Sequence, residues 1–180
     1  MVYVHFADGF EEMEALVPVD ALRRAGIETK MVSIMGRLNV RGAHDVEVAS
    51  DILFEDADYD SCEMIVLPGG SEGADHLRAH EGLTKKILSF ADQGKNLAAI
   101  CASPAVVFGS LGILRGKRAT CYPGLENEME GAIRAEGNAV RDGNIITSRG
   151  PATAPDFAFA LIEMLKGAEI KEEVAARMLY

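Results

Sequence analysis

A cysteine at the end of a short apolar segment is the residue of this chain best placed for covalent chemistry. The small apolar residues before Cys101 predict a buried strand, and Pro104 favours the first turn of a helix directly after it. Cys101 would then lie at a helix N-terminus, where unpaired N–H groups and the helix dipole favour a thiolate. Ala102 and Ser103 are small enough for the sharp turn of a nucleophile elbow. The alternative is an inert buried thiol, the common state of a free cysteine.

Paired glycines follow a second apolar segment. Gly69 and Gly70 come after a run of buried-strand character, and such a turn can direct N–H groups at a developing oxyanion. An ordinary turn is the alternative interpretation. If this strand end lies beside Cys101, the N–H groups of Gly70 and Ala102 could form an oxyanion hole.

An acidic segment, D-G-F-E-E-M-E, follows the first apolar run and opens a helical pattern. Acids at this position usually form a solvated helix cap. Because Pro18 cannot donate to the carbonyl of Glu14, we expect the helix to kink there or to begin afresh near Val17. Glu14 would then be held at the sheet edge, where a buried carboxyl beside a thiolate stays protonated and donates a hydrogen bond to sulfur.

The four histidines argue against several familiar enzymes. All of them precede Cys101, whereas papain-like proteases and class I amidotransferases need a histidine after the nucleophile. We interpret His5 as a core residue of a buried strand, and His76 and His80 as solvated. The cysteines are widely spaced, and no H-x-E-x-H, C-x-x-C or glycine-rich phosphate motif occurs. The sequence therefore predicts neither a metal nor a cofactor.

Composition excludes other functions. The net charge of -10, with no run of five like charges, argues against binding nucleic acid or an anionic membrane through a basic surface. No stretch of eighteen apolar residues occurs, so no membrane span is predicted. With three cysteines and no secretory signal pattern, we expect free thiols and a cytoplasmic protein. The absence of linker-like or repeated segments predicts one domain, residues 1–180.

The expected elements alternate between strands and helices, which predicts an α/β fold with a mostly parallel sheet covered on both faces. A hairpin is expected around Asp142 and Gly143, and Gly167 should end a helix. Ligands in such folds bind at the carboxyl ends of the strands. Strands are predicted at 2–6, 27–34, 64–67 and 97–100, and helices at 11–25, at 83–93, from 103 and from 155.

Five segments, in order along essentially the whole chain, resemble the ThiJ/PfpI superfamily: F-A-D-G-F-E-E-M-E-A, V-D-A-L-R-R-A-G-I, I-V-L-P-G-G, A-A-I-C-A-S-P and I-T-S-R-G-P-A-T-A. They are most similar to the subfamily containing the human parkinsonism-linked protein deglycase. The resemblance implies a flavodoxin-like three-layer sandwich, usually a homodimer, with Asp20 and Arg24 near the dimer interface. It implies Cys101 as the nucleophile and Glu14 as the acid that hydrogen-bonds to it. Its further matches are Gly70 and Ala102 as oxyanion-hole donors, with Gly69, Tyr122 and Arg149 near the site.

One position departs from the family pattern. Many members of the subfamily carry a histidine before the proline that follows the fifth strand, and this chain has Tyr122 there. A Cys–His dyad is therefore excluded, because tyrosine at its ordinary pKa is a poor base at neutral pH. The protease branch has histidine directly after the cysteine, where this chain has Ala102. We expect neither peptidase activity nor, without an ATP site, thiazole kinase activity.

The resemblance implies two functions that the sequence does not separate. One is cofactor-independent detoxification of reactive aldehydes, of the glyoxalase or deglycase type, acting on methylglyoxal or its adducts with a role in oxidative stress. The other is a non-enzymatic redox sensor or stress chaperone that uses an oxidisable Cys101. Cys121 could resolve an oxidised Cys101 or serve only in core packing, and Cys62 is interpreted as structural.

Overall fold

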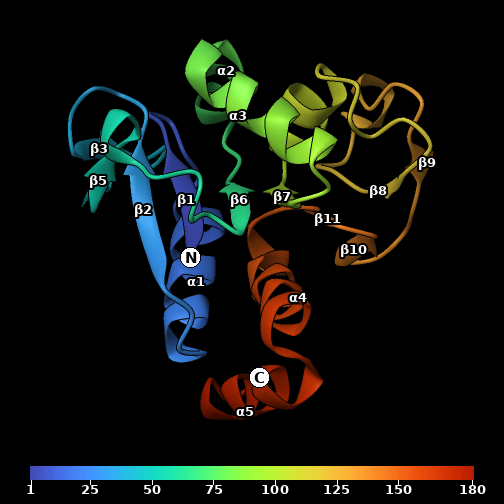
Figure 1. The fold of residues 1–180 in the computed structure, drawn as a ribbon. Coiled ribbons are helices and arrows are strands. Elements are labelled where there is room, and N and C mark those ends of the chain that lie inside the picture. The colour runs from blue at the N-terminus through green and yellow to red at the C-terminus, as the bar shows by residue number, and fades with distance from the viewer.

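Seven strands form the central sheet of the computed structural model, which describes residues 1–180 (Figure 1). They are β1 (Val2–Phe6), β2 (Thr29–Ser33), β5 (Ile52–Leu53), β6 (Met64–Leu67), β7 (Asn96–Ile100), β10 (Ala139–Asp142) and β11 (Ile145–Ser148). The order across the sheet is β10-β11-β7-β6-β1-β2-β5, and every neighbouring pair is parallel except β10 and β11. Two small sheets add β3 (Asn39–Arg41) with β4 (Glu47–Ala49) and β8 (Arg118–Ala119) with β9 (Ile133–Arg134).

Helices cover both faces of the sheet. One face carries α1 (Glu12–Arg24), α4 (Ala154–Lys166) and α5 (Ala168–Arg177); the other carries α2 (Ser71–Ala79), α3 (Glu81–Asp92) and a π-helix (Pro104–Gly109) (Figure 1). Because side chains alternate along a strand, β1 supplies both cores: Val4 packs toward α1 and α4, and Tyr3 toward α3. The three-layer, mostly parallel α/β architecture expected from the sequence is confirmed.

The structure also corrects parts of the expected element map. Helix α1 is continuous through Pro18, so a fresh start near Val17 is wrong. Proline removes only one hydrogen bond of the helix, and the buried face of α1 that includes Ala15 and Leu22 holds the two halves together. The hairpin around Gly143 is confirmed, and that glycine has the positive φ of 60° that such a turn requires.

Two helices were missed by the sequence patterns. Helix α2 buries only Gly73, Ala74 and Leu77 among nine residues, and α5 buries only Val174 and Ala175 among ten. Such sparse apolar positions give almost no helical periodicity. None of the helices combines the length and apolar character needed to cross a bilayer.

The histidines away from the reactive cysteine have structural roles. His5 is fully buried as expected, with Nε2 2.7 Å from the Tyr59 hydroxyl, and burial lowers its pKa to about 3. His76 and His80 are half-buried rather than solvated. The Nδ1 of His76 donates to the Asp8 carbonyl at 2.9 Å, and the Nδ1 of His80 accepts from the first turn of α3.

We predict that Phe157→Ala lowers the free energy of unfolding by about 3 to 5 kcal/mol, because it leaves a cavity where α4 meets the sheet. Phe157 is fully buried in the core shared by α1, α4 and the sheet. Urea denaturation measures the change. Ile133→Ala is the control, since Ile133 is 56% exposed, and a similar loss in both variants would contradict the prediction.

Candidate functional site

Cys101 lies at the carboxyl end of β7, in the middle of the sheet. Its backbone N–H donates to the carbonyl of Ser148 at 3.0 Å, and its carbonyl accepts from the N–H of Tyr122 at 2.8 Å. Its φ is 66°, a left-handed conformation that is strained for a residue other than glycine. The two hydrogen bonds hold this strained turn, so the nucleophile-elbow geometry expected from the sequence is present.

Glu14 reaches the same edge from the first turn of α1. Its side chain is fully buried, and its Oε2 accepts the N–H of Gly69 at 2.9 Å. The backbone around it is held as well: the N–H of Glu14 donates to Glu11 Oε2 at 2.8 Å, and the N–H of Glu11 donates to the Gly69 carbonyl at 3.0 Å. The start of α1 is thus joined to the end of β6.

Gly69 is the point where the acid and the thiol meet. A Cβ on this residue would lie 2.5 Å from Glu14 Oε2, 2.6 Å from Cys101 Cβ and 3.0 Å from Cys101 Sγ. No side chain fits there. Because both side chains border the same missing Cβ, the structure brings together the acid and the cysteine, as the resemblance implies.

Burial controls the protonation of the pair. Loss of solvent raises the pKa of Glu14 to about 7, with hydrogen bonds from Cys101 and Gly69 opposing the shift. Burial, followed by the charge of Glu14, raises the pKa of the Cys101 thiol to about 12, while the N–H groups of Gly70 and Ala102 lower it. This is opposite to the thiolate expected from a helix N-terminus, because burial outweighs those N–H groups. Burial thus disfavours the charged form of both groups, and a pKa of about 7 lets Glu14 exchange its proton near neutral pH.

One oxygen of the Glu14 carboxyl is left without a partner. Oε1 is buried and has no hydrogen bond in the protein. It lies 4.0 Å from where a Cβ on Gly150 would be, and the Tyr122 ring lies 3.5 Å from that same point. The orphaned oxygen therefore faces the region bordered by Gly150 and the half-exposed Tyr122. A buried, unpaired carboxyl oxygen beside a nucleophile can exchange a proton with a bound molecule.

Arg149, the remaining residue placed near the site by the resemblance, lines a different hollow. That hollow has Cys121 in its wall, and neither Cys101 nor Glu14 lines it. The neighbouring Gly150 is the residue of this segment that borders the acid.

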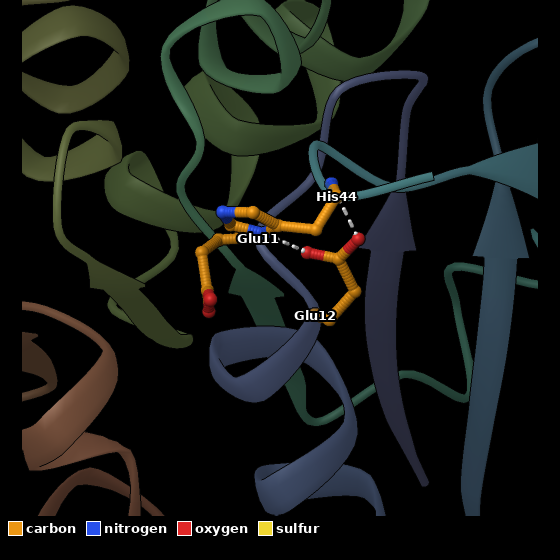
Figure 2. Close-up of side chains that lie close together, drawn as sticks. All are labelled: Glu11, Glu12 and His44. Atoms are coloured by element: carbon orange, nitrogen blue, oxygen red, sulfur yellow. Dashed lines mark hydrogen bonds and ion pairs between the residues drawn. The ribbon is translucent and has the colours of Figure 1, made fainter. Parts of the chain in front are cut away.

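The structure contains a further cluster of possible metal ligands that the sequence analysis did not identify. Glu11, Glu12 and His44 lie together at the start of α1 (Figure 2), with one ligand atom of each within 4.8 Å of the others. The Nδ1 and backbone N–H of His44 each lie 2.7 Å from an oxygen of Glu12, which raises the pKa of the imidazole. These residue types could hold a divalent metal ion, which the sequence did not predict. No motif marks the group, because its histidine and acids lie on segments distant in sequence.

We predict that Glu14→Gln has a higher free energy of unfolding than wild type and that this difference increases with pH. The folded protein keeps the Glu14 proton up to about pH 7, whereas the unfolded chain releases it near the ordinary value of 4.5. Between these values the folded state binds more protons, so the wild type loses stability as the pH rises. The amide of the variant cannot ionise, and its oxygen still accepts from Gly69. Between pH 5 and pH 8 the difference in unfolding free energy should grow by about 2 to 3 kcal/mol.

Urea denaturation of both proteins across this pH range measures that difference. Glu126→Gln is the control, since Glu126 is solvent-accessible and its pKa is lowered rather than raised. A difference between Glu14→Gln and wild type that stays constant from pH 5 to pH 8 would show that Glu14 is not held protonated.

Known proteins resemble this chain along nearly its full length. Residues 1–164 match the model of the DJ-1/PfpI family. The chain is 36% identical to the Parkinson disease protein 7 homolog of Danio rerio, covering 98% of this chain and 95% of that protein. It is 39% identical to the Protein DJ-1 homolog B of Arabidopsis thaliana, of which it spans only 38%.

A solved structure described as Toxoplasma gondii DJ-1, oxidized, superposes with a TM-score of 0.96 and 38% identity, covering 99% of this chain and 97% of that one. The structure of Drosophila melanogaster DJ-1beta superposes with a TM-score of 0.93 and 35% identity, covering 99% of this chain and 96% of that one. The matched family model, the identities and the shared fold agree. On these grounds the chain belongs to the DJ-1/PfpI family.

Proposed function

We propose that this protein is a cofactor-independent enzyme that detoxifies small reactive aldehydes such as methylglyoxal and its thiol or amine adducts, using Cys101 and Glu14. The observation that carries the proposal is the buried Glu14 carboxyl, which contacts the cysteine region across Gly69 and keeps one oxygen free. A carboxyl with a pKa of about 7 is suited to give and take protons at neutral pH.

The first step is addition of the thiol to the aldehyde. Ionised Glu14 accepts the proton of Cys101 as the S–C bond forms, and the C=O electron pair moves onto oxygen. The N–H groups of Gly70 and Ala102 stabilise that oxyanion. Glu14 then returns the proton to the oxygen, which gives a hemithioacetal. Base catalysis by Glu14 removes the need for a preformed thiolate, which the raised pKa of Cys101 disfavours.

The second step moves a proton between carbons. Glu14 removes the C–H proton of the carbon bonded to sulfur and delivers it to the neighbouring carbonyl carbon, while the hydroxyl proton of the first carbon passes to the oxygen of the second. The first carbon thereby becomes the carbonyl of a thioester, and the second carries the hydroxyl group. Water hydrolyses the thioester, releases a 2-hydroxy acid and restores the Cys101 thiol. Methylglyoxal and one water thus give lactate without an external oxidant. Cys101 is only 8% exposed, which favours compact aldehydes.

The proposal includes a homodimer acting in the cytoplasm. Membership of the family and the exposed apolar side chain of Met13 on α1 support a partner surface on this helix. Asp20 and Arg24, which the resemblance places near such an interface, form an ion pair of 2.6 Å on the same helix.

We predict that purified protein converts methylglyoxal to lactate and that Cys101→Ser lowers kcat/KM by at least about a hundredfold, because the hydroxyl is a far weaker nucleophile. Glu14→Gln should lower it by roughly a hundredfold to ten-thousandfold through loss of the proton carrier. Cys121→Ser, which removes another buried thiol, is the matched control and should keep full activity. Equal turnover by wild type and Cys101→Ser would rule out the proposed catalyst.

Redox sensing is the second candidate, and one comparison favours it. The Toxoplasma gondii relative is described as oxidized, and its structure superposes on nearly the whole chain. Two peroxide molecules would convert the Cys101 thiol to a sulfinic acid and release two waters. Protonated Glu14 and the N–H groups of Gly70 and Ala102 could donate hydrogen bonds to the sulfinate oxygens.

We predict that graded hydrogen peroxide adds two oxygen atoms to Cys101 before Cys62 or Cys121, because Cys101 alone is hydrogen-bonded to a carboxyl that can take up its proton. Intact mass and peptide mapping measure the order of modification, and Glu14→Gln should slow the first addition. Equal oxidation of all three cysteines would contradict sensing at Cys101. Selective oxidation without aldehyde turnover would favour the sensor over the enzyme.

A further inference from the structure

A hollow of about 580 Å³ lies beside β8, β9 and the start of β10, apart from the Cys101 site. Its size is that of a small-molecule pocket. Ala119, Cys121 and Met129 give it an apolar, fully covered floor, since each is at most 3% exposed. Tyr122, whose N–H bonds the Cys101 carbonyl, follows Cys121 directly, so one short segment borders both the hollow and the reactive cysteine.

Charges of both signs line this hollow. Arg134 and Arg149 supply two guanidinium groups, and Glu126 and Glu136 supply two carboxylates. None of the four takes part in any ion pair of the chain.

Two of these side chains have hydrogen-bond partners that do not neutralise them. A nitrogen of Arg134 donates to Asn127 Oδ1, and Glu126 Oε2 accepts the N–H of Gly124 at 2.8 Å. Backbone hydrogen bonds lower the pKa of Glu126, and the charges of Arg134 and Arg149 add to this, so the guanidinium groups lie within electrostatic reach of it. The opposite charges therefore line the same space without forming an ion pair.

We propose that the hollow binds a free α-amino acid with an apolar side chain, in its zwitterionic form. The carboxylate pairs with Arg134 and Arg149, in the bidentate geometry that guanidinium groups favour. The ammonium group pairs with Glu126 and Glu136, and the side chain rests on Met129 and its apolar neighbours. A ligand that carries both charges can pair with both sets of side chains, which do not pair with one another. A phosphate or dicarboxylate would place a second negative charge against the two glutamates.

This site does not depend on the activity proposed for Cys101, and its test measures binding alone. The probes are L-leucine, 4-methylpentanoate, which lacks the ammonium group, and 3-methylbutylamine, which lacks the carboxylate. Isothermal titration calorimetry of the purified protein at low salt should show leucine binding at least about tenfold more tightly than either fragment, since each fragment loses one set of ion pairs. A fragment that binds as tightly as leucine would overturn the proposal.

Substitutions test which side chains bind the carboxylate of the ligand and which bind its ammonium group. Arg149→Gln and Arg134→Gln should each weaken leucine binding by at least about tenfold while leaving 3-methylbutylamine binding unchanged. Glu136→Gln should reduce the preference for leucine over 4-methylpentanoate, because one of the two carboxylates that pair with the ammonium group is lost. Arg141→Gln is the matched control, because the Arg141 side chain also lacks an ion pair, donates a hydrogen bond to the Gly143 carbonyl and lies outside the hollow.

Two arginine variants are used so that the test can still be made if one of them fails to fold. A thermal midpoint within a few degrees of that of wild type establishes that a variant is folded. Equal effects of Arg149→Gln, Arg134→Gln and Arg141→Gln in folded protein would refute the site, as would the absence of any leucine binding by wild type.

Discussion

The hydrogen bond from the Gly69 N–H to the buried Glu14 carboxyl is the contact on which the reactive site depends. It joins the first turn of α1 to the end of β6, and the missing side chain of Gly69 lets Cys101 approach from β7. The same burial raises the pKa of the carboxyl to about 7 and raises the pKa of the cysteine thiol. The raised pKa values of the acid and the thiol follow from one packing constraint, since both groups are removed from water at the same sheet edge.

The strained turn at Cys101 has a related origin. A left-handed residue other than glycine persists only where the surroundings determine it. Here the neighbouring strand β11 and the Tyr122 segment each contribute one backbone hydrogen bond to Cys101. The Tyr122 segment also separates two regions of different chemistry. One side has a single carboxyl and a thiol in an uncharged setting; the other has guanidinium groups and carboxylates around an apolar floor.

Much of this molecule was predictable from local sequence. The apolar run ending at Cys101, the Gly69–Gly70 pair and the turn at Gly143 each carry their signal within a few residues, because strands and tight turns are governed by short-range patterns. Parallel strands align their carboxyl ends, so three distant motifs could be assigned to one edge. Helix α5 escaped prediction because its few buried residues leave no periodic signal.

What the sequence determined by itself was the order of the main strands, the family and the place of the cysteine, since these rest on local patterns and on motifs shared with relatives. Only the tertiary structure decided the raised pKa of Cys101, the continuous helix through Pro18 and the gathering of Arg134 and Arg149 around one hollow. The physical reason is the same in each case. Burial, helix packing and charge proximity depend on residues far apart in the chain, and no local pattern records those distances.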